Sequence, residues 1–276
     1  MKDWGRWRLR AKHSRADWIE DAKKRAAIEA VKHVKDDQII GLGSGSTAAY
    51  ALKEIGKLIR QKRWRILGVP TSYQAFLLAV DCGIQVTTLD EHPELDVTID
   101  GADQIDLNVN MIKGMGGALA REKIVALASK QNVIVADETK LVKQLVNNHP
   151  IPVEVLPFAA TSTMSKIREA GGKPVIRLGT GKVGPVVTDN GNFILEVWMR
   201  RIDDPRKLDA RLKSISGVVE TGLFLGTADL VYVGTSSTVR RLEKTDFQTT
   251  YKSKTFFMCL GGSHPFFRSS LMTPTI

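Results

Sequence analysis

The chain has 276 residues, of which 43% are hydrophobic and 25% are charged, the composition of an ordinary globular protein. No stretch approaches the roughly 18 uninterrupted apolar residues of a membrane-spanning helix, and the basic N-terminus lacks the apolar core of a signal peptide, so we expect no membrane partner. The formal charge of +10 lies mainly at the ends, with +5 in residues 1–15 and +3 in residues 244–276, and the nearly balanced remainder argues against a specific nucleic-acid partner.

Short apolar strands alternate with helical patterns through the first half of the chain. Residues 17–34 carry apolar side chains at helical spacing, with Asp17 as the N-cap. Strands are expected at 38–42, 65–69, 86–89, 97–99 and 132–136, and helices at 48–61, 71–80 and 119–130. This alternation predicts an α/β domain with a mostly parallel sheet.

The pattern changes at residues 147–157, where three prolines occur within eight residues. Helices are expected at 161–170 and 205–215, with short strands at 174–177, 186–188 and 193–197 and a turn at 189–192. The apolar run at 230–234 then has the character of a buried strand again. We infer that a small α+β unit is inserted and that the chain returns to complete the first sheet.

The segment Gly41–Thr47, GLGSGST, joins a predicted strand to a helix N-terminus. Glycines permit a tight turn, and the free amides at a helix start favour an anion. The segment has neither the Gly-Lys-Ser/Thr of a Walker loop nor the spacing of a dinucleotide fingerprint. The pattern favours phosphate binding, and the alternative is a Ser-capped helix that follows a glycine turn.

Two aspartates follow the predicted strand that ends near Ile99. Asp100 closes the strand and Asp103 lies three residues on, at the sheet edge where open parallel sheets bind ligands. The alternative is that both stabilise a turn, which is the reading we favour for Asp106 and Asn108.

A lysine and a glycine cluster come next, in the sequence Lys113-Gly114-Met115-Gly116-Gly117. A cation beside exposed amides can stabilise a developing oxyanion. Glu122 begins the following helix, where a glutamate commonly just compensates the helix dipole. Together with Asp100, Asp103 and Lys113, however, it forms an acid–base cluster suited to proton transfer on a small polar substrate.

The remaining candidates are more isolated. Lys23 or Lys24 could reach the phosphate loop, although a helical lysine is usually solvated, and Lys140 follows a strand at the same sheet edge. None of the five histidines has a serine or cysteine partner that suggests a triad. Cys82 and Cys259 lie far apart, which fits neither a disulfide framework nor a metal site and is consistent with the reducing cytoplasm.

Seven blocks in order resemble the ribose-5-phosphate isomerase family of type A. They are GLGSGSTA, TIDGADQID, MIKGMGGALAREKI, VADETK, PVEVLPF, VVTDNGNFILEV and SISGVVETGLF, and the match covers about residues 17–243. The resemblance implies a Rossmann-like domain at 17–145 and 218–243, with an inserted α+β domain of ferredoxin-like type at 146–217. The extensions 1–16 and 244–276 fall outside it.

The resemblance also implies an activity and a set of site residues. The family interconverts ribose 5-phosphate and ribulose 5-phosphate without metal or organic cofactor, as a cytoplasmic homodimer or homotetramer. Glu122 would move the proton through an enediolate, assisted by Lys113, and Asp100 could help to open the sugar ring. The substrate-binding residues would be Lys23, Ser44, Gly45, Ser46, Thr47, Asp100, Gly101, Ala102, Asp103, Lys113, Gly114, Met115, Gly116 and Lys140.

Two positions depart from the family's motifs. Gln104 stands where the motif usually has Glu, which removes a charge beside the site, and Met115 replaces a usual Gly. Two other classes of protein remain open. A sugar-phosphate sensor would keep the phosphate loop and could lose the catalytic set, and an acyl-CoA transferase-like enzyme would use a glutamate as nucleophile.

Overall fold

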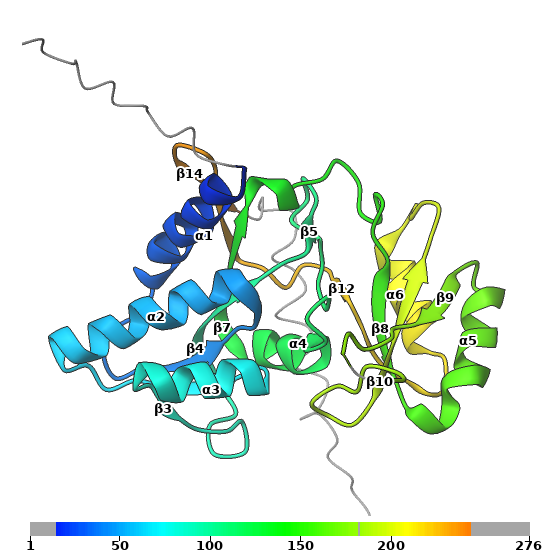
Figure 1. Ribbon diagram of the computed structural model, residues 1–276, viewed down its shortest axis with the longest axis horizontal. Coiled ribbons are helices and arrows are strands. Elements are labelled where there is room, and N and C mark those ends of the chain that lie inside the picture. The colour runs from blue at the N-terminus through cyan, green and yellow to red at the C-terminus, as the bar shows by residue number, and fades with distance from the viewer. Residues whose placement is uncertain (1–14, 182, 244–276) are drawn as a thin grey trace, which may run out of the picture. The chain divides into compact units, whose positions relative to one another are not determined.

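The computed structural model describes residues 15–181 and 183–243 (Figure 1). Cys259 and nearly all of the two predicted extensions lie outside these residues. The described part of the chain belongs to one compact unit. None of its helices is long and apolar enough to cross a membrane.

The main sheet has seven strands in the order β14-β13-β7-β4-β1-β2-β3. All neighbours run parallel except β14, which is antiparallel to β13 at the edge. This confirms the predicted α/β fold with a mostly parallel sheet. Its strands are β1 (Ile39–Leu42), β2 (Leu67–Pro70), β3 (Gln85–Val86), β4 (Leu95–Gly101), β7 (Ser129–Asp137), β13 (Leu230–Gly234) and β14 (Val239–Glu243).

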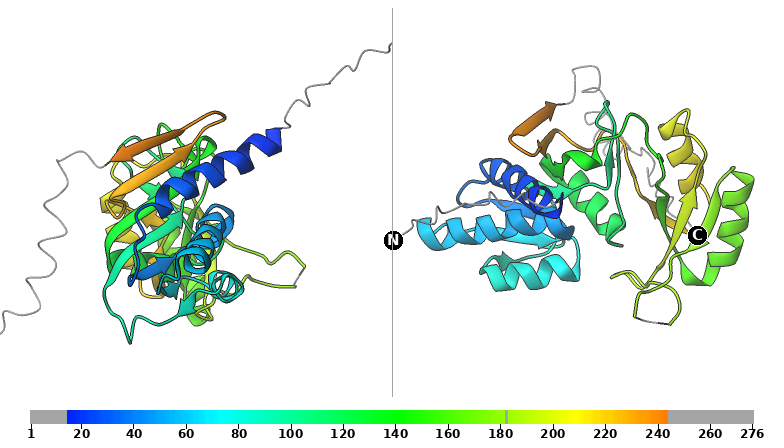
Figure 2. Two further views of the ribbon diagram at one scale, coloured as in Figure 1. Left: turned by 90° about the vertical axis from the view of Figure 1, so that its left-hand side faces the viewer. Right: turned by 45° about the horizontal axis from the view of Figure 1, so that its top comes forward.

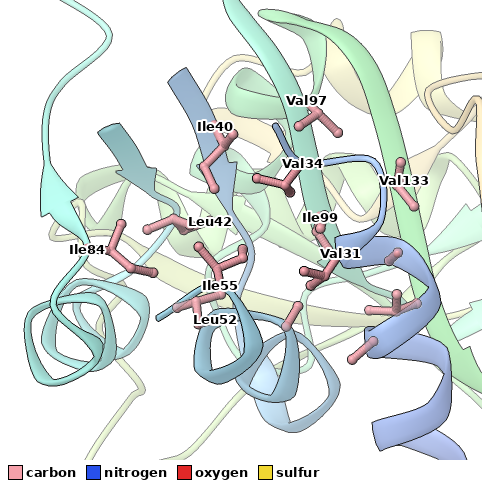
Figure 3. Packing of buried hydrophobic residues seen from close by; sticks show 14 of the residues in the cluster. Val31, Val34, Ile40, Leu42, Leu52, Ile55, Ile84, Val97, Ile99 and Val133 are labelled. Atoms are coloured by element: carbon pink, nitrogen blue, oxygen red, sulfur yellow. The ribbon is translucent and has the colours of Figure 1, made fainter. Parts of the chain in front are cut away.

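Three helices cover one face of this sheet: α1 (Arg15–Val31), α2 (Gly45–Lys62) and α3 (Tyr73–Cys82) (Figures 1 and 2). Alternate strand residues point at them, so Ile40, Leu42, Val97 and Ile99 form a buried core with the helices (Figure 3). Gly234 lets α1 approach closely, because a Cβ there would lie 2.0 Å from the Ala22 carbonyl oxygen.

The opposite face is covered by α4 (Leu119–Leu127) and by a three-stranded sheet in the order β12-β6-β5. These strands are β5 (Gln104–Ile105), β6 (Met111–Ile112) and β12 (Leu223–Phe224), and none of the three was expected from the sequence. Met111, Leu119, Ile134 and Phe224 are fully buried between them and the main sheet. This packing holds the start of α4 beside the carboxyl end of β4.

A four-stranded antiparallel sheet, in the order β11-β8-β10-β9, contains β8 (Ile151–Val155), β9 (Lys173–Ile176), β10 (Phe193–Trp198) and β11 (Val218–Thr221). Helices α5 (Ala160–Glu169) and α6 (Pro205–Lys213) pack against this sheet. Two short 3-10 helices, η1 (Glu138–Lys140) and η2 (Pro157–Ala159), complete the described elements.

The four-stranded sheet corrects three sequence predictions. Its inner strand β8 was missed because Pro152 lies within it, yet its side chains are fully buried. Residues 186–188 form an isolated bridge between Val187 and Phe193 instead of a strand. β11 pairs with β8, so this sheet extends past the predicted boundary at 217. An apolar pattern alone does not say which of two sheets a strand will join.

Candidate active site

A cavity of about 450 Å³ opens at the carboxyl ends of β1, β2, β4 and β7. Ligands bind at this edge in open parallel sheets because the loops that follow neighbouring strands converge there. The cavity collects most of the predicted site residues, namely Lys23, Ser44, Gly45, Ser46, Thr47, Gly101, Ala102, Asp103, Lys113, Gly114, Gly116, Glu122 and Lys140. Asp100 and Met115 are the two predicted residues that do not line it.

The loop between β1 and α2 has the geometry of an anion site. Gly45 begins α2 with a φ of +91°, a conformation that favours glycine, and its amide donates to Gln74 Oε1 at 2.8 Å. The amides of Ser46 and Thr47, in the same first turn, have no helical acceptor. Gly43 passes so close to β4 that a Cβ would lie 2.5 Å from the Asp100 Cα. From α1, Lys23 Nζ lies 3.2 Å from Ser46 Oγ, whereas Lys24 is exposed outside the cavity lining. This segment, Ser44–Thr47, is called the anion loop below. It brings backbone amides and hydroxyls together with the Lys23 ammonium.

A buried charge cluster forms the opposite part of the site. Lys113 Nζ lies 3.0 Å from Asp100 Oδ2 and 3.2 Å from Glu122 Oε2, and it donates to the Gly101 carbonyl at 2.7 Å. All three ionisable side chains are at most 7% exposed. Asp100 Oδ1 accepts from the Ser44 and Gly101 amides, which links the cluster to the anion loop.

Burial and the neighbouring charges shift the pKa values of Glu122 and Lys113, the two members of this cluster that line the cavity. Burial is the largest influence on Glu122 and outweighs the attraction of Lys113, so the pKa of Glu122 rises to about 8. Burial alone would lower the pKa of Lys113, but Asp100, Glu122 and Asp103 together raise it above its ordinary value. Lys113 thus stays charged near neutral pH while Glu122 can both take and give a proton.

Met115 is accommodated without entering the cavity. Its amide donates to Asp103 Oδ2 at 2.9 Å, and its side chain is 44% exposed beside the Arg177 guanidinium. Arg177 also donates to the Gly114 and Met115 carbonyls at 2.9 and 3.1 Å. The Met115 side chain therefore contacts Arg177 on the outer side of the loop. Gly114 and Gly116, on either side of it, line the cavity.

Gln104 makes one hydrogen bond as a donor and one as an acceptor, and an ionised glutamate could not donate the first. It is 5% exposed, its Nε2 donates to the Asn147 carbonyl at 2.9 Å, and its Oε1 accepts from the Val146 amide at 3.0 Å. The side chain faces residues 146–147 and does not line the cavity. Asp106 accepts from the amides of Asn108 and Asn110, which confirms its predicted turn role.

Several cavity residues were missed in the sequence: Ile19, Ser72, Gln74, Ala118, Asp137, Thr139 and Asp189. Ser72 and Asp137 follow strands that were predicted, so their place at the sheet edge was available as a signal. Asp189 comes from the turn before β10, and no local pattern connects it to this edge. Within the described ranges, no group of three or more His, Cys, Asp or Glu side chains could hold a metal ion.

Comparison with known proteins adds independent findings. The model of the family described as ribose 5-phosphate isomerase A (phosphoriboisomerase A) matches residues 67–238. A ribose-5-phosphate isomerase A of Methanosarcina acetivorans is 51% identical over 212 residues, which cover 77% of this chain and 89% of the relative.

Two solved structures are similar to the chain as well. The ribose 5-phosphate isomerase A of Methanocaldococcus jannaschii has a TM-score of 0.79 at 46% identity, over 82% of this chain and 99% of that one. A D-ribose-5-phosphate isomerase in complex with phospho-erythronic acid has a TM-score of 0.79 at 45% identity, with the same coverage of 82% and 99%.

Proposed function

The chain belongs to the ribose 5-phosphate isomerase A family, and we propose that it interconverts D-ribose 5-phosphate and D-ribulose 5-phosphate through an enediolate, with Glu122 as the proton carrier. The family membership confirms the resemblance seen in the sequence motifs. The observation that carries the mechanism is the contact of 3.2 Å between Glu122 and Lys113 within the wall of one cavity.

The two side chains suit the two requirements of this reaction. Glu122 takes the proton from C2 of the aldose and returns a proton to C1, while the hydroxyl proton moves from O2 to O1. The charge that develops on the oxygen between these steps is stabilised by the Lys113 ammonium, which is held in place before the substrate arrives. Asp100 is 2% exposed and does not line the cavity, so its proposed role is to orient Lys113 rather than to open the sugar ring.

The phosphate group is proposed to bind at Ser44–Thr47 together with Lys23, while Asp103 and Lys140 contact the sugar. A sugar-phosphate ligand is supported by the family's complex with phospho-erythronic acid. The predicted homodimer or homotetramer and the cytoplasmic location remain predictions from the family.

Incorporation of deuterium from the solvent tests whether the reaction passes through an enediolate. Isomerisation in D₂O with EDTA present should place deuterium at the carbon that is reprotonated, because the proton taken up by Glu122 can exchange with solvent before the bound enediolate is reprotonated. Mass spectrometry of the product measures this incorporation. Complete retention of the substrate hydrogen would contradict exchange at the enediolate stage, and binding without turnover would favour the sugar-phosphate sensor.

Lys23→Ala should raise KM for ribose 5-phosphate roughly tenfold or more, with a smaller effect on kcat, because a hydrogen bond to a charged group is worth about 1.5–3 kcal/mol. Lys24→Ala is the matched control, since Lys24 is the next residue of α1 and lies outside the cavity lining. Steady-state kinetics of both variants provide the measurement. Equal KM values would remove Lys23 from the phosphate site.

The pH profile of kcat/KM should rise about tenfold per pH unit and level off near pH 8. Glu122 accepts a proton only when ionised, and burial raises its pKa to about 8, so the active form is lost as the pH falls below that value. Lys113 keeps its charge across this range because its pKa is raised. A profile that is flat down to about pH 5 would contradict the raised pKa of Glu122, since a glutamate with an ordinary pKa stays ionised to that pH.

A further inference from the structure

A second buried carboxylate lies outside the cavity. Glu154, in β8, is 0% exposed. Its Oε1 accepts hydrogen bonds from Thr188 Oγ1 at 2.9 Å, Asn190 Nδ2 at 3.0 Å and Asn192 Nδ2 at 2.8 Å. Its Oε2 has no hydrogen-bond partner among the described residues. One carboxylate oxygen therefore accepts hydrogen bonds from three side chains of the turn at residues 188–192.

The same turn reaches the anion loop. Asp189 lines the cavity, and its Oδ2 accepts from the Tyr73 amide at 2.7 Å. Tyr73 is the first residue of α3, and the Oγ of the preceding Ser72 accepts a hydrogen bond from Ser44 Oγ at 2.6 Å. A short chain of contacts thus runs from the turn to the loop where phosphate is proposed to bind.

The turn also reaches the helix that carries the proposed base. Arg121 donates to Asn190 Oδ1 and to the Asp189 carbonyl, both at 2.7 Å. Its guanidinium lies 5.3 Å from the centre of the Tyr73 ring. Arg121 directly precedes Glu122 in the first turn of α4, so the two halves of the site meet at residues 189–190.

We propose that Glu154 is a positioning residue for the isomerisation: it holds the 188–192 turn in the conformation that joins the anion loop to the start of α4. This inference rests on the proposed roles of Glu122 and of Ser44–Thr47. Three hydrogen bonds to Glu154 Oε1 offset the cost of burying this polar group. An apolar residue would fill the same volume but would leave the three donors without their acceptor.

Two substitutions at this position separate the outcomes. Glu154→Leu should lower kcat/KM about 10–100-fold, because small displacements of aligned groups cost rates of this order. Glu154→Gln should restore most of this activity, because its Oε1 can accept the same three hydrogen bonds. Asn190→Ala is a second route should Glu154→Leu fail to fold, since exposed Asn190 contacts both Glu154 and Arg121. It should lower kcat/KM in the same direction.

Thr163→Val is the matched control for loss of stability alone. Thr163 is also 0% exposed and lies in α5, which packs against the same four-stranded sheet as the one that contains Glu154. It donates to the Ser216 carbonyl, away from the 188–192 turn. This variant should lower the melting temperature and leave kcat/KM unchanged. If the Glu154→Leu or Asn190→Ala enzyme, once folded, kept the kcat/KM of Thr163→Val, the positioning role would be overturned.

Hydrogen exchange at the Tyr73 amide provides a readout that does not depend on activity. The amide is held by Asp189 in the intact protein, so its exchange should accelerate in Glu154→Leu and return toward normal in Glu154→Gln. Unchanged exchange would show that Glu154 does not hold the turn. An active Glu122→Gln enzyme would instead overturn the proposed base, with the Tyr73 exchange result still standing, so the two failures are distinguishable.

Discussion

Glu122→Gln should keep the fold and lower kcat by about 10²–10⁴-fold, the usual contribution of a positioned general base. Glutamine has nearly the same shape and can still accept a hydrogen bond from Lys113, so the cavity keeps its form. It cannot accept the proton from the substrate carbon. The expected signature is a large fall in kcat with a small change in KM, because the phosphate is proposed to bind at the anion loop and not at Glu122.

Glu54→Gln is a suitable control for this substitution. Glu54 lies on α2 and pairs with Lys57 outside the cavity, so the same chemical change should leave both kinetic constants unaltered. Circular dichroism and thermal unfolding would verify that both variants fold. Substantial turnover by Glu122→Gln would rule out Glu122 as the proton carrier.

Lys113→Met should reduce both catalysis and stability. Loss of one preorganised stabiliser of the developing charge typically lowers kcat about 10²–10³-fold. Removal of one partner from a buried ion cluster typically costs about 3–5 kcal/mol, and here Asp100 and Glu122 would remain without their cation. Because the attraction of Lys113 lowers the pKa of Glu122, the acid limb of the pH profile should also move to higher pH.

Lys123→Met is a close control, since Lys123 is 5% exposed and, like Lys113, lies over the Phe224 ring. It pairs with Glu220 at 2.8 Å and with the Thr221 carbonyl, and it does not line the cavity. Urea unfolding of the two variants should show comparable losses of stability, whereas kcat should fall sharply only for Lys113→Met. Equal losses of kcat would mean that Lys113 acts through stability alone.

The local patterns predicted most of the parallel sheet. Apolar runs that end at glycine or aspartate identified the strands near Ile40, Ile99 and Val135, because a strand buried on both faces reads as a continuous apolar segment. The same logic failed for β8, where Pro152 made a fully buried strand resemble a loop. It also failed for the two-residue strands of the small third sheet, which are too short to show a period.

The candidate site, like the fold, was predicted only in part from the sequence. Asp100, Lys113 and Glu122 could be grouped from the sequence because they follow neighbouring elements within one short region. Glu122 alone looks like an ordinary residue of a first helical turn, and only the 3.2 Å contact with Lys113 gives it a chemical partner. The departure at Gln104 appeared to remove a charge beside the site, and its side chain instead holds residues 146–147.

The sequence by itself determined the fold class, the anion loop and the acid–base cluster, because hydrophobic periodicity, glycine conformation and strand ends are local properties. Only the tertiary structure decided that Asp189 lines the cavity and that Glu154 holds its turn. Those contacts join segments that are distant in the chain, and they depend on how α4 packs between the main sheet and the four-stranded sheet. No periodicity within either segment encodes that packing.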